Sequence, residues 1–405
     1  MIELIYSLFL LSGLIKSFII IYADSLHVID FTLLCALFLL GIYVLHFGKN
    51  FFFKNTFYVT HKSKAIIFCV FVLYSWMIIT LVYTPSPEYC YIKVFMFLTD
   101  LLALLFPFIY RKFNPERFFH IFVYLGSSLV FIYSALLPDV YANYLRYSEY
   151  REFVVKYLDI GYLSGIVILM LAFTCPRIKP LPRILLIGTN AWTLVISSAR
   201  GPLVFLFIVL MIRFVVVSIR FLKKWKLNLK NILYTIGAIG LLGAAVVYLI
   251  DKYALFLERS IFRLSLLADP QSGGVAKRLS LIYFSLDKIF ENAVNFLFGL
   301  GIGSFGILYD GVDERNYPHN VILEIWFELG ILGVAMFALL LFIYFKKVRF
   351  NLNFVLIFGY LLLNGLKSYS LADSLIMYGI LSVLVLSSIL LKPNGQGKED
   401  FDEQF

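Results

Sequence analysis

A histidine, an asparagine and two glycines stand close together in a segment of the sequence that is otherwise largely apolar. Residues 318–333 read PHNVILEIWFELGILG, which places His319 and Asn320 at the mouth of an apolar helix. An imidazole has an ordinary pKa of about 6.5, so it can accept a proton from a hydroxyl group near neutral pH. At the water edge of a membrane helix, His319 is therefore a candidate proton-transfer group, and the alternative is a structural histidine.

Two carboxylates follow on the same predicted helix, Glu324 and Glu328, one helical turn apart. A carboxylate in the first turns of a membrane helix is unfavourable unless it is paired. Pairing with an arginine, or a contact that orients the imidazole, would each account for these glutamates, and the plain alternative is a pair of interfacial side chains. We expect Asn320, Glu324 and Glu328 to support the candidate site.

Two arginines are placed where they could bind an anion. Arg200, in the segment SSARGP, stands at the outer end of a predicted span, where the orientation bias disfavours basic residues. Arg278 stands near the start of a predicted amphipathic helix. A guanidinium group held at the membrane boundary binds phosphate or another anion through paired hydrogen bonds. The alternatives are an interfacial arginine at Arg200 and a solvated helix residue at Arg278.

Further charged residues lie beside or within the predicted spans. A second outer loop, residues 138–157, contains Arg146 and Arg151, which we expect to support the same site. Lys93 and Asp100 are two turns apart on one span and so share a face. No chain of acids follows them, as a proton relay would require, so the sequence favours a structural ion pair.

These side chains must be positioned by membrane helices. The 405-residue chain is 61% hydrophobic and 15% charged, which is outside the range of a soluble domain. Apolar runs of about 20 residues recur, and lipid offers the backbone no hydrogen bonds, so the runs must be helices or a closed barrel. Their continuous apolarity, without a period-two alternation, selects helices. The sequence predicts an all-α, polytopic integral membrane protein with about twelve transmembrane helices. The expected spans are residues 3–22, 28–46, 65–84, 92–110, 118–137, 158–175, 183–198, 202–219, 231–250, 321–345, 353–371 and 374–391.

Basic residues cluster between alternate spans, whereas the intervening short connections at residues 24–27 and 84–91 carry none. This is the positive-inside distribution, and it predicts that both termini are cytoplasmic. The net charge of +10 is therefore attributed to topology. We expect the lipid bilayer, and not nucleic acid, as the partner of these basic groups.

One connection dominates the predicted outer face. The expected division is residues 1–250 for helices 1–9, 251–318 for a large outer loop, 319–392 for helices 10–12 and 393–405 for a polar cytoplasmic tail. Within the loop, residues 276–292 carry apolar side chains at helical spacing, which predicts an amphipathic helix. The stripe comprises Leu279, Ile282, Tyr283, Leu286, Ile289 and Phe290. Residues 299–306, read as GLGIGSFG, predict a flexible turn that leads back toward His319.

Three blocks of the sequence resemble the O-antigen ligase and O-antigen polymerase superfamily of bacterial membrane glycosyltransferases. The first is SSARGPLVFL at residues 197–206, and the second is AKRLSLIYFSLDKIF at 276–290, followed by FLFGLGIGSFG. The third is HNVILEIWFELGILG at 319–333, which fits the family pattern of His-Asn, nine residues, Gly, two residues and Gly. The resemblance covers roughly residues 183–345, and the third block is its most specific part.

The resemblance implies glycan transfer from an undecaprenyl-diphosphate carrier on the periplasmic face of the bacterial inner membrane. Arg200 and Arg278 match the arginines that hold the donor diphosphate, and His319 matches the histidine that activates the acceptor hydroxyl. Such a reaction would invert the anomeric centre. We expect it to need no cofactor and no metal, because guanidinium groups can offset the charge of the leaving diphosphate.

Several functions fit this resemblance. A polymerase joins undecaprenyl-diphosphate-linked repeat units, whereas a ligase moves the finished glycan onto lipid A-core. SARGP and the Gly-rich return favour the polymerase, and the ligase is the alternative. A flippase or transporter for the same lipid-linked glycan would show internal repeats and charges at mid-membrane depth, which this sequence does not suggest. A chain-length regulator and a flippase are further candidate partners.

Overall fold

The computed structural model describes residues 1–22, 30–52, 63–110, 112–143, 156–175, 177–197, 199–224 and 273–391. Within these ranges the regular structure is entirely helical, and no strand is present. The predicted all-α class is thus confirmed for the part of the chain that the structure describes. A helix satisfies its own backbone hydrogen bonds, which is the requirement that lipid imposes on these apolar segments.

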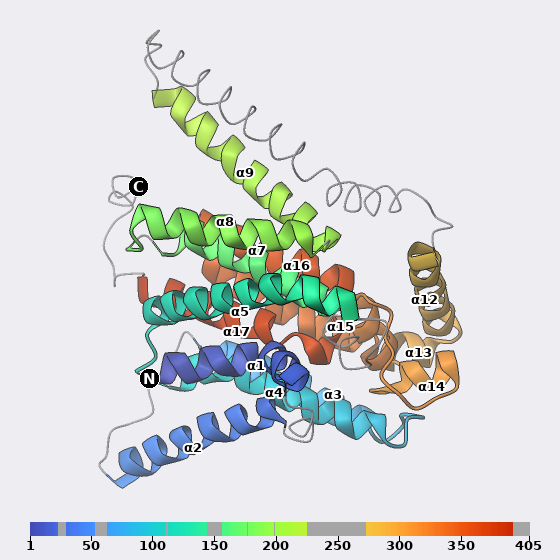
Figure 1. Ribbon diagram of the computed structural model, residues 1–405. Helices are drawn as coiled ribbons and strands as arrows, with labels where there is room; N and C mark the ends of the chain where they lie inside the picture. Colours follow the sequence, from blue (N-terminus) through green and yellow to red (C-terminus); the bar gives the residue numbers. More distant parts are fainter. Residues whose placement is uncertain are drawn as a thin grey trace.

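The helices that correspond to predicted spans form a bundle (Figure 1). They are α1 (Ile2–Tyr22), α2 (Phe31–Phe52), α3 (Lys64–Thr80), α4 (Tyr89–Ile109), α5 (Pro115–Asn143), α7 (Tyr157–Phe173), α8 (Pro180–Ile196), α9 (Arg200–Lys224), α15 (Val321–Val348), α16 (Leu352–Ser368) and α17 (Leu375–Leu391). Among the described residues, α1, α4, α5, α9 and α15 are long and apolar enough to cross a membrane, and the rest of this set are shorter apolar helices. The chain is therefore an integral membrane protein. The expected number of about twelve spans is not confirmed, and the span expected at residues 231–250 lies outside the described residues.

Two helices form the inside of the bundle. Every residue of α7 from position 160 to 171 is buried, and most of α17 is buried as well. Neither helix has a polar face, which is typical of a helix that is covered on all sides. α7 packs on α5, α8, α9 and α16, while α17 packs on α4 and α15. This frame fixes the ends of α4, α15 and α16, where the candidate site lies.

The described part of the predicted outer loop is partly helical, as the sequence predicts. It contains α12 (Gly273–Phe290), α13 (Ala293–Phe298) and α14 (Ser304–Asp310), which lie together at the right of Figure 1, away from the N-terminus. A small apolar core joins these helices to the first half of α15. Its buried members are Leu281, Ile289, Phe305 and Phe327. The loop is thus anchored on the helix that follows His319.

The buried face of α12 differs from the predicted stripe. Leu281, Ser285 and Ile289 are buried, whereas Tyr283 and Phe290 are 67% and 60% exposed. Ser285 donates a hydrogen bond to the carbonyl of Leu281 at 2.7 Å, so its polar group is satisfied inside the helix. Because Ser285 is small and its hydroxyl is already hydrogen-bonded, α12 can pack closely on its neighbours along this face. The rings of Tyr283 and Phe290 lie on the exposed side of the helix.

Candidate active site

His319 lies in the connection that immediately precedes α15. Asn320 is the N-cap of that helix, because its side-chain oxygen accepts hydrogen bonds from the backbone N–H groups of Ile322 and Leu323, both at 3.0 Å. His319 has a φ of 54°, a left-handed conformation that is uncommon for a residue with a side chain. Its ring packs edge-on against Tyr317, with 4.5 Å between the ring centroids. Asn320 thus supports His319 by fixing the start of α15.

The surroundings of His319 favour its neutral form. Burial lowers the pKa of His319 below its ordinary value, and the charge of Arg278 lowers this pKa further. A hydrogen bond between the imidazole and the backbone of Ser368, and the charge of Glu324, act in the opposite direction without reversing the shift. A neutral imidazole at pH 7 can accept a proton, so His319 has the state that a general base requires.

His319 and Arg278 line one cavity of about 550 Å³. Arg315, Tyr317 and Ser368 also line it, so cationic and hydrogen-bonding groups gather around the imidazole. Other parts of the wall are apolar and come from α1, α2, α4 and α17. These residues are Leu10, Leu14, Leu33, Phe95, Met96, Leu375, Ile376 and Met377. The cavity therefore combines a polar region, which Asp30 and Asp159 also line, with an apolar region suited to a hydrocarbon chain.

The second predicted arginine, Arg200, is the first residue of α9 and is partly buried. It is not among the described residues that line the cavity. Both Arg200 and Arg278 act electrostatically on Lys367, which stands in the last turn of α16. Lys367 is therefore a cationic residue close enough to both predicted arginines to be influenced by the charge of each.

Lys367 was not among the site residues predicted from the sequence, although a signal was present. The segment NGLKSYS follows an apolar run, and Lys367 stands at the same predicted side of the membrane as His319. Basic residues are disfavoured on the outer side, which is the argument that singled out Arg200. The same argument, applied to the end of α16, would have identified this lysine.

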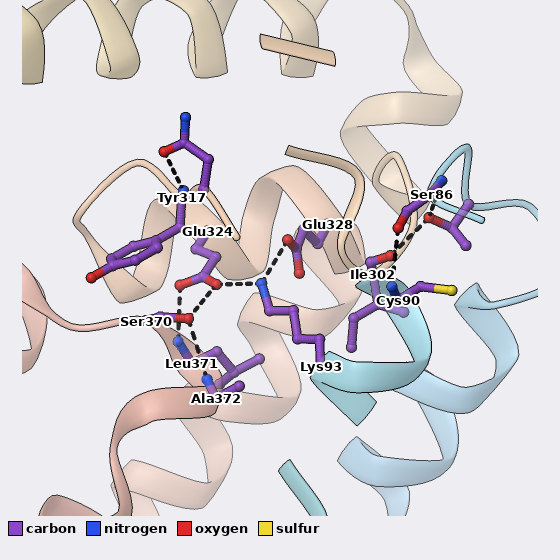
Figure 2. A network of polar contacts seen from close by, with 12 residues as sticks. Ser86, Cys90, Lys93, Ile302, Tyr317, Glu324, Glu328, Ser370, Leu371 and Ala372 are labelled. Carbon is purple, nitrogen blue, oxygen red and sulfur yellow. Dashed lines mark hydrogen bonds and ion pairs between the residues drawn. The ribbon is translucent and has the colours of Figure 1, made fainter. Parts of the chain in front are cut away.

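A buried ion-pair network joins α4 to the first turns of α15, the helix that follows His319 (Figure 2). Lys93 of α4 pairs with both Glu324 and Glu328 of α15, the second at 2.7 Å, and all three side chains are at most 1% exposed. Glu324 also accepts hydrogen bonds from the Ser370 hydroxyl at 2.7 Å and the Leu371 backbone N–H at 2.9 Å. The partner of the two glutamates is thus a lysine from another helix. The sequence hypotheses named an arginine or the imidazole.

The ion pair expected between Lys93 and Asp100 is wrong, since Lys93 pairs with the two glutamates instead. Seven residues along a helix correspond to a rise of about 10 Å, which is too far for a direct contact between these side chains. Asp100 is buried, and its carboxyl group forms a hydrogen bond with the backbone of Ser374. Its Oδ2 atom has no hydrogen-bond partner. Sharing a helix face does not by itself bring two residues into contact.

α15 is broken at the first glycine of the predicted motif. Gly330 has φ 70° and ψ −175°, which only glycine adopts readily, so the helical ladder stops and restarts there. The carbonyls freed by the break are occupied: those of Phe327 and Glu328 accept from the N–H groups of Leu300 and Gly301, at 2.8 and 2.9 Å. The carbonyl of Leu329 accepts from the indole N–H of Trp76 at 2.9 Å. Backbone N–H groups of the Gly-rich return thus satisfy two of the carbonyls that the break leaves without a partner inside the helix.

Asp313 ties the loop before His319 to the start of α4. Its carboxylate accepts hydrogen bonds from the Ser86 hydroxyl at 2.5 Å and from the N–H groups of Glu88 and Tyr89 at 2.7 and 3.0 Å. Partial desolvation opposes ionisation, but these bonds outweigh it and lower the pKa of Asp313 below its ordinary value. The loop is therefore held on two sides, by Asp313 and by the Glu324 network.

Two predicted supporting residues, Arg146 and Arg151, lie outside the described residues, so their placement stays a prediction. Within the described ranges, no group of three or more His, Cys, Asp or Glu side chains could hold a metal ion. The expectation that the reaction needs no metal is not tested by this geometry and also stays a prediction.

Comparison with known proteins identifies the segment that contains these groups. Residues 184–338 match the O-antigen ligase family. The match includes Arg200, Arg278 and His319, and the predicted resemblance to the O-antigen ligase and polymerase superfamily is thereby confirmed for this segment. Lys93 and Lys367 lie outside the O-antigen ligase segment, although both contact or act on residues within it.

Two curated proteins are similar to this chain. A candidate polysaccharide ligase of Rickettsia conorii is 31% identical over 137 residues, which cover 29% of this chain and 33% of that protein. A second candidate polysaccharide ligase, from Rickettsia prowazekii, is 29% identical over 137 residues with the same coverage. The chain thus spans about a third of the length of the curated relatives it matches. The family match and both names favour the ligase alternative over the polymerase that the sequence had favoured.

Proposed function

We propose that this protein is a membrane glycosyltransferase, an O-antigen ligase that moves a glycan from a lipid diphosphate carrier to an acceptor hydroxyl. The observation that carries the proposal is the shared cavity of His319 and Arg278, in which a neutral imidazole and a guanidinium group line the same space. A glycosyl transfer to a hydroxyl group requires a base for the acceptor and positive charge for the leaving group.

The reaction follows from these roles. His319 takes the proton of the acceptor hydroxyl as its oxygen bonds to the anomeric carbon of the donor. The bond between that carbon and the diphosphate oxygen breaks, and the electron pair leaves with the lipid diphosphate. Arg278 and Arg200 stabilise the negative charge that grows on this group, which lowers the barrier because the interaction is strongest in the transition state. Attack opposite to the leaving group inverts the anomeric centre.

The apolar part of the cavity supports a lipid-linked donor. A soluble sugar nucleotide would leave this wall unused, whereas a polyprenyl chain can lie against Leu10, Phe95 and Met377. Undecaprenyl diphosphate has the required combination of an anionic head and a long hydrocarbon chain.

The orientation in the membrane is part of the proposal. α15 carries Lys346 and Lys347 in its last turn, while His319 precedes its first turn. The two groups therefore stand at opposite ends of this 28-residue apolar helix, which is long enough to cross a membrane despite its break at Gly330. If the lysines face the cytoplasm, as the positive-inside rule predicts, His319 faces the periplasm across the bacterial inner membrane.

The choice between ligase and polymerase rests on two arguments. The family match and the names of the relatives support the ligase, in which lipid A-core is the acceptor. The Gly-rich return had favoured the polymerase, but its glycines serve the break in α15, a structural need that both activities share. The polymerase is therefore the second candidate.

Gel analysis of lipopolysaccharide from a strain deleted for this gene tests the proposal. Loss of the ligase leaves core without O-antigen, while long glycan accumulates on the lipid carrier. Loss of the polymerase leaves core that carries a single repeat unit. Normal lipopolysaccharide and normal surface polysaccharide in the deleted strain would contradict both candidates.

A further inference from the structure

Lys367 is held against the first turn of α9 by close packing. A Cβ atom placed on Gly201 would lie 2.9 Å from Lys367 Nζ and 3.0 Å from its Cδ, so the lysine occupies the space that a side chain at position 201 would need. Gly201 is the neighbour of Arg200 in the SSARGP block. The Nζ atom also lies 5.8 Å from the ring centroid of Phe205, which favours a cation at this place.

The charges that act most on Lys367 are cationic. Arg278 and Arg200 both act on its ammonium group, one from α12 and one from α9. Three positive charges that gather in a partly buried place repel one another, and the repulsion is stronger than it would be in water. Such a cluster is stabilised when an anion with several charges binds among its members.

We infer that Lys367, which packs on Gly201 beside Arg200, is a third binding residue for the donor diphosphate. This inference rests on the proposed function. A diphosphate presents oxygens on two phosphorus atoms and can contact three cations at once, whereas a monophosphate or a sugar carboxylate is smaller. The cluster therefore selects diphosphate over monophosphate.

Lys367 also connects this anion site to the base. The next residue, Ser368, lines the cavity and supplies the backbone group that hydrogen-bonds to the imidazole of His319. An anion bound at Lys367 is thus held by the same helix end that orients the base. This arrangement would set the bond to be broken beside the acceptor hydroxyl, and proximity of this kind lowers the barrier.

Binding of inorganic pyrophosphate to the full-length protein in detergent tests the inference without glycan transfer. Lys367→Gln should raise the Kd for pyrophosphate about tenfold, as expected for the loss of one charge-assisted contact, and should raise the Kd for inorganic phosphate less. Lys288→Gln is the matched control. Lys288 is on α12 but pairs with Glu291 at 3.1 Å, so its removal should leave the Kd unchanged.

Gly201→Ala gives an independent variant in which the lysine remains. The added methyl group displaces the ammonium group, so the Kd for pyrophosphate should again rise, and this variant decides the matter if Lys367→Gln does not fold. Equal Kd values for the wild type and the folded variants would overturn the inference.

Failure of the inference can be told apart from failure of the proposed function. If O-antigen is missing from the lipopolysaccharide of the deleted strain but Lys367→Gln binds pyrophosphate normally, only the role of Lys367 is wrong. If lipopolysaccharide is unaffected but pyrophosphate binding depends on Lys367, the anion site stands and the proposed reaction is wrong.

Discussion

Lys93 of α4 and Glu324 of α15 form an ion pair inside the protein, with side-chain exposures of 1% and 0%. Glu324 extends the pair to Ser370 and Leu371, just after the end of α16, whose Ser368 contacts His319. The network therefore joins three segments that surround the proposed base. Its effect on stability depends on all members together, because a buried charge is favourable only while its partners are present.

Replacement of Lys93 by Met should destabilise the protein strongly, because Glu324 and Glu328 would remain buried without a cation. Removal of one partner of a buried pair costs roughly 3–5 kcal/mol. The expected result is a large drop in the melting temperature of the purified protein in detergent. Lys64→Met, at an exposed residue at the start of α3, is the control and should melt like the wild type. The triple variant Lys93→Met, Glu324→Gln, Glu328→Gln should recover part of the loss, and a wild-type melting temperature for Lys93→Met alone would contradict the argument.

Gly330→Ala should damage the break in α15. A Cβ atom at this position would lie 2.2 Å from the carbonyl oxygen of Leu297, and the backbone conformation is one that only glycine adopts readily. Backbone strain alone costs on the order of 1–3 kcal/mol, and the clash adds to it. We expect low yield and a lowered melting temperature. Gly359→Ala in α16 meets nothing within 4 Å and should be tolerated, so equal behaviour of the two variants would refute the explanation.

Arg278→Lys should reduce glycan transfer although the charge is retained. A lysine lacks the paired donors that bind a phosphate group at two oxygens, and loss of one charged hydrogen bond costs about 1.5–3 kcal/mol. The expected effect is roughly a 10- to 100-fold loss in kcat/KM for the lipid-linked donor. Lys288→Arg, which makes the reverse exchange on the same helix, should have no effect. Full activity of Arg278→Lys would indicate a solvated residue.

Glycan transfer by the purified protein should survive chelation by EDTA. Arg200, Arg278 and Lys367 supply positive charge at the site, so the leaving diphosphate has a counter-charge from the protein itself. The measurement is the transfer rate before and after dialysis against EDTA. A loss of activity that Mg²⁺ or another divalent ion restores would show that a metal takes part.

The parts of the site that were predictable from sequence are those whose signal is local. His319 and Asn320 were found because they stand at the mouth of an apolar helix where a titratable imidazole could transfer a proton, and Arg200 because its position opposes the orientation bias. Membrane helices were predictable because apolar runs of sufficient length have few alternatives in lipid. The all-α class follows from the same constraint.

The parts that were not predictable depend on which helices become neighbours. Lys93 meets Glu324 across more than 200 positions of sequence, and nothing at either position specifies the partner. The break at Gly330 is similar, because its free carbonyls are satisfied by Leu300 and Gly301 of a distant segment. The glycines of the return at residues 299–306 and of the motif at Gly330 were both visible in the sequence. Nothing in it showed that these two segments form hydrogen bonds with each other.

The most direct test of the base is the pH dependence of transfer. Burial and the charge of Arg278 lower the pKa of His319, so the neutral form persists below the ordinary value of 6.5. Activity should be full at pH 7 and should fall on acidification with a midpoint below 6.5, when the imidazole becomes protonated. Acid should also destabilise the fold, because the unfolded chain binds this proton more readily and stability then rises with pH.

His319→Ala and His319→Gln should lose about 10²- to 10⁴-fold in kcat while remaining folded, and their residual activity should lack this acid limb. His120→Gln on α5 is the matched control. The imidazole of His120 forms a hydrogen bond with the backbone carbonyl of Glu116, in its own helix, at 2.8 Å. The control should keep the wild-type rate and the wild-type pH profile. Persistence of the acid limb in the residual activity of His319→Gln would assign the titration to another group and remove the argument for His319 as the base.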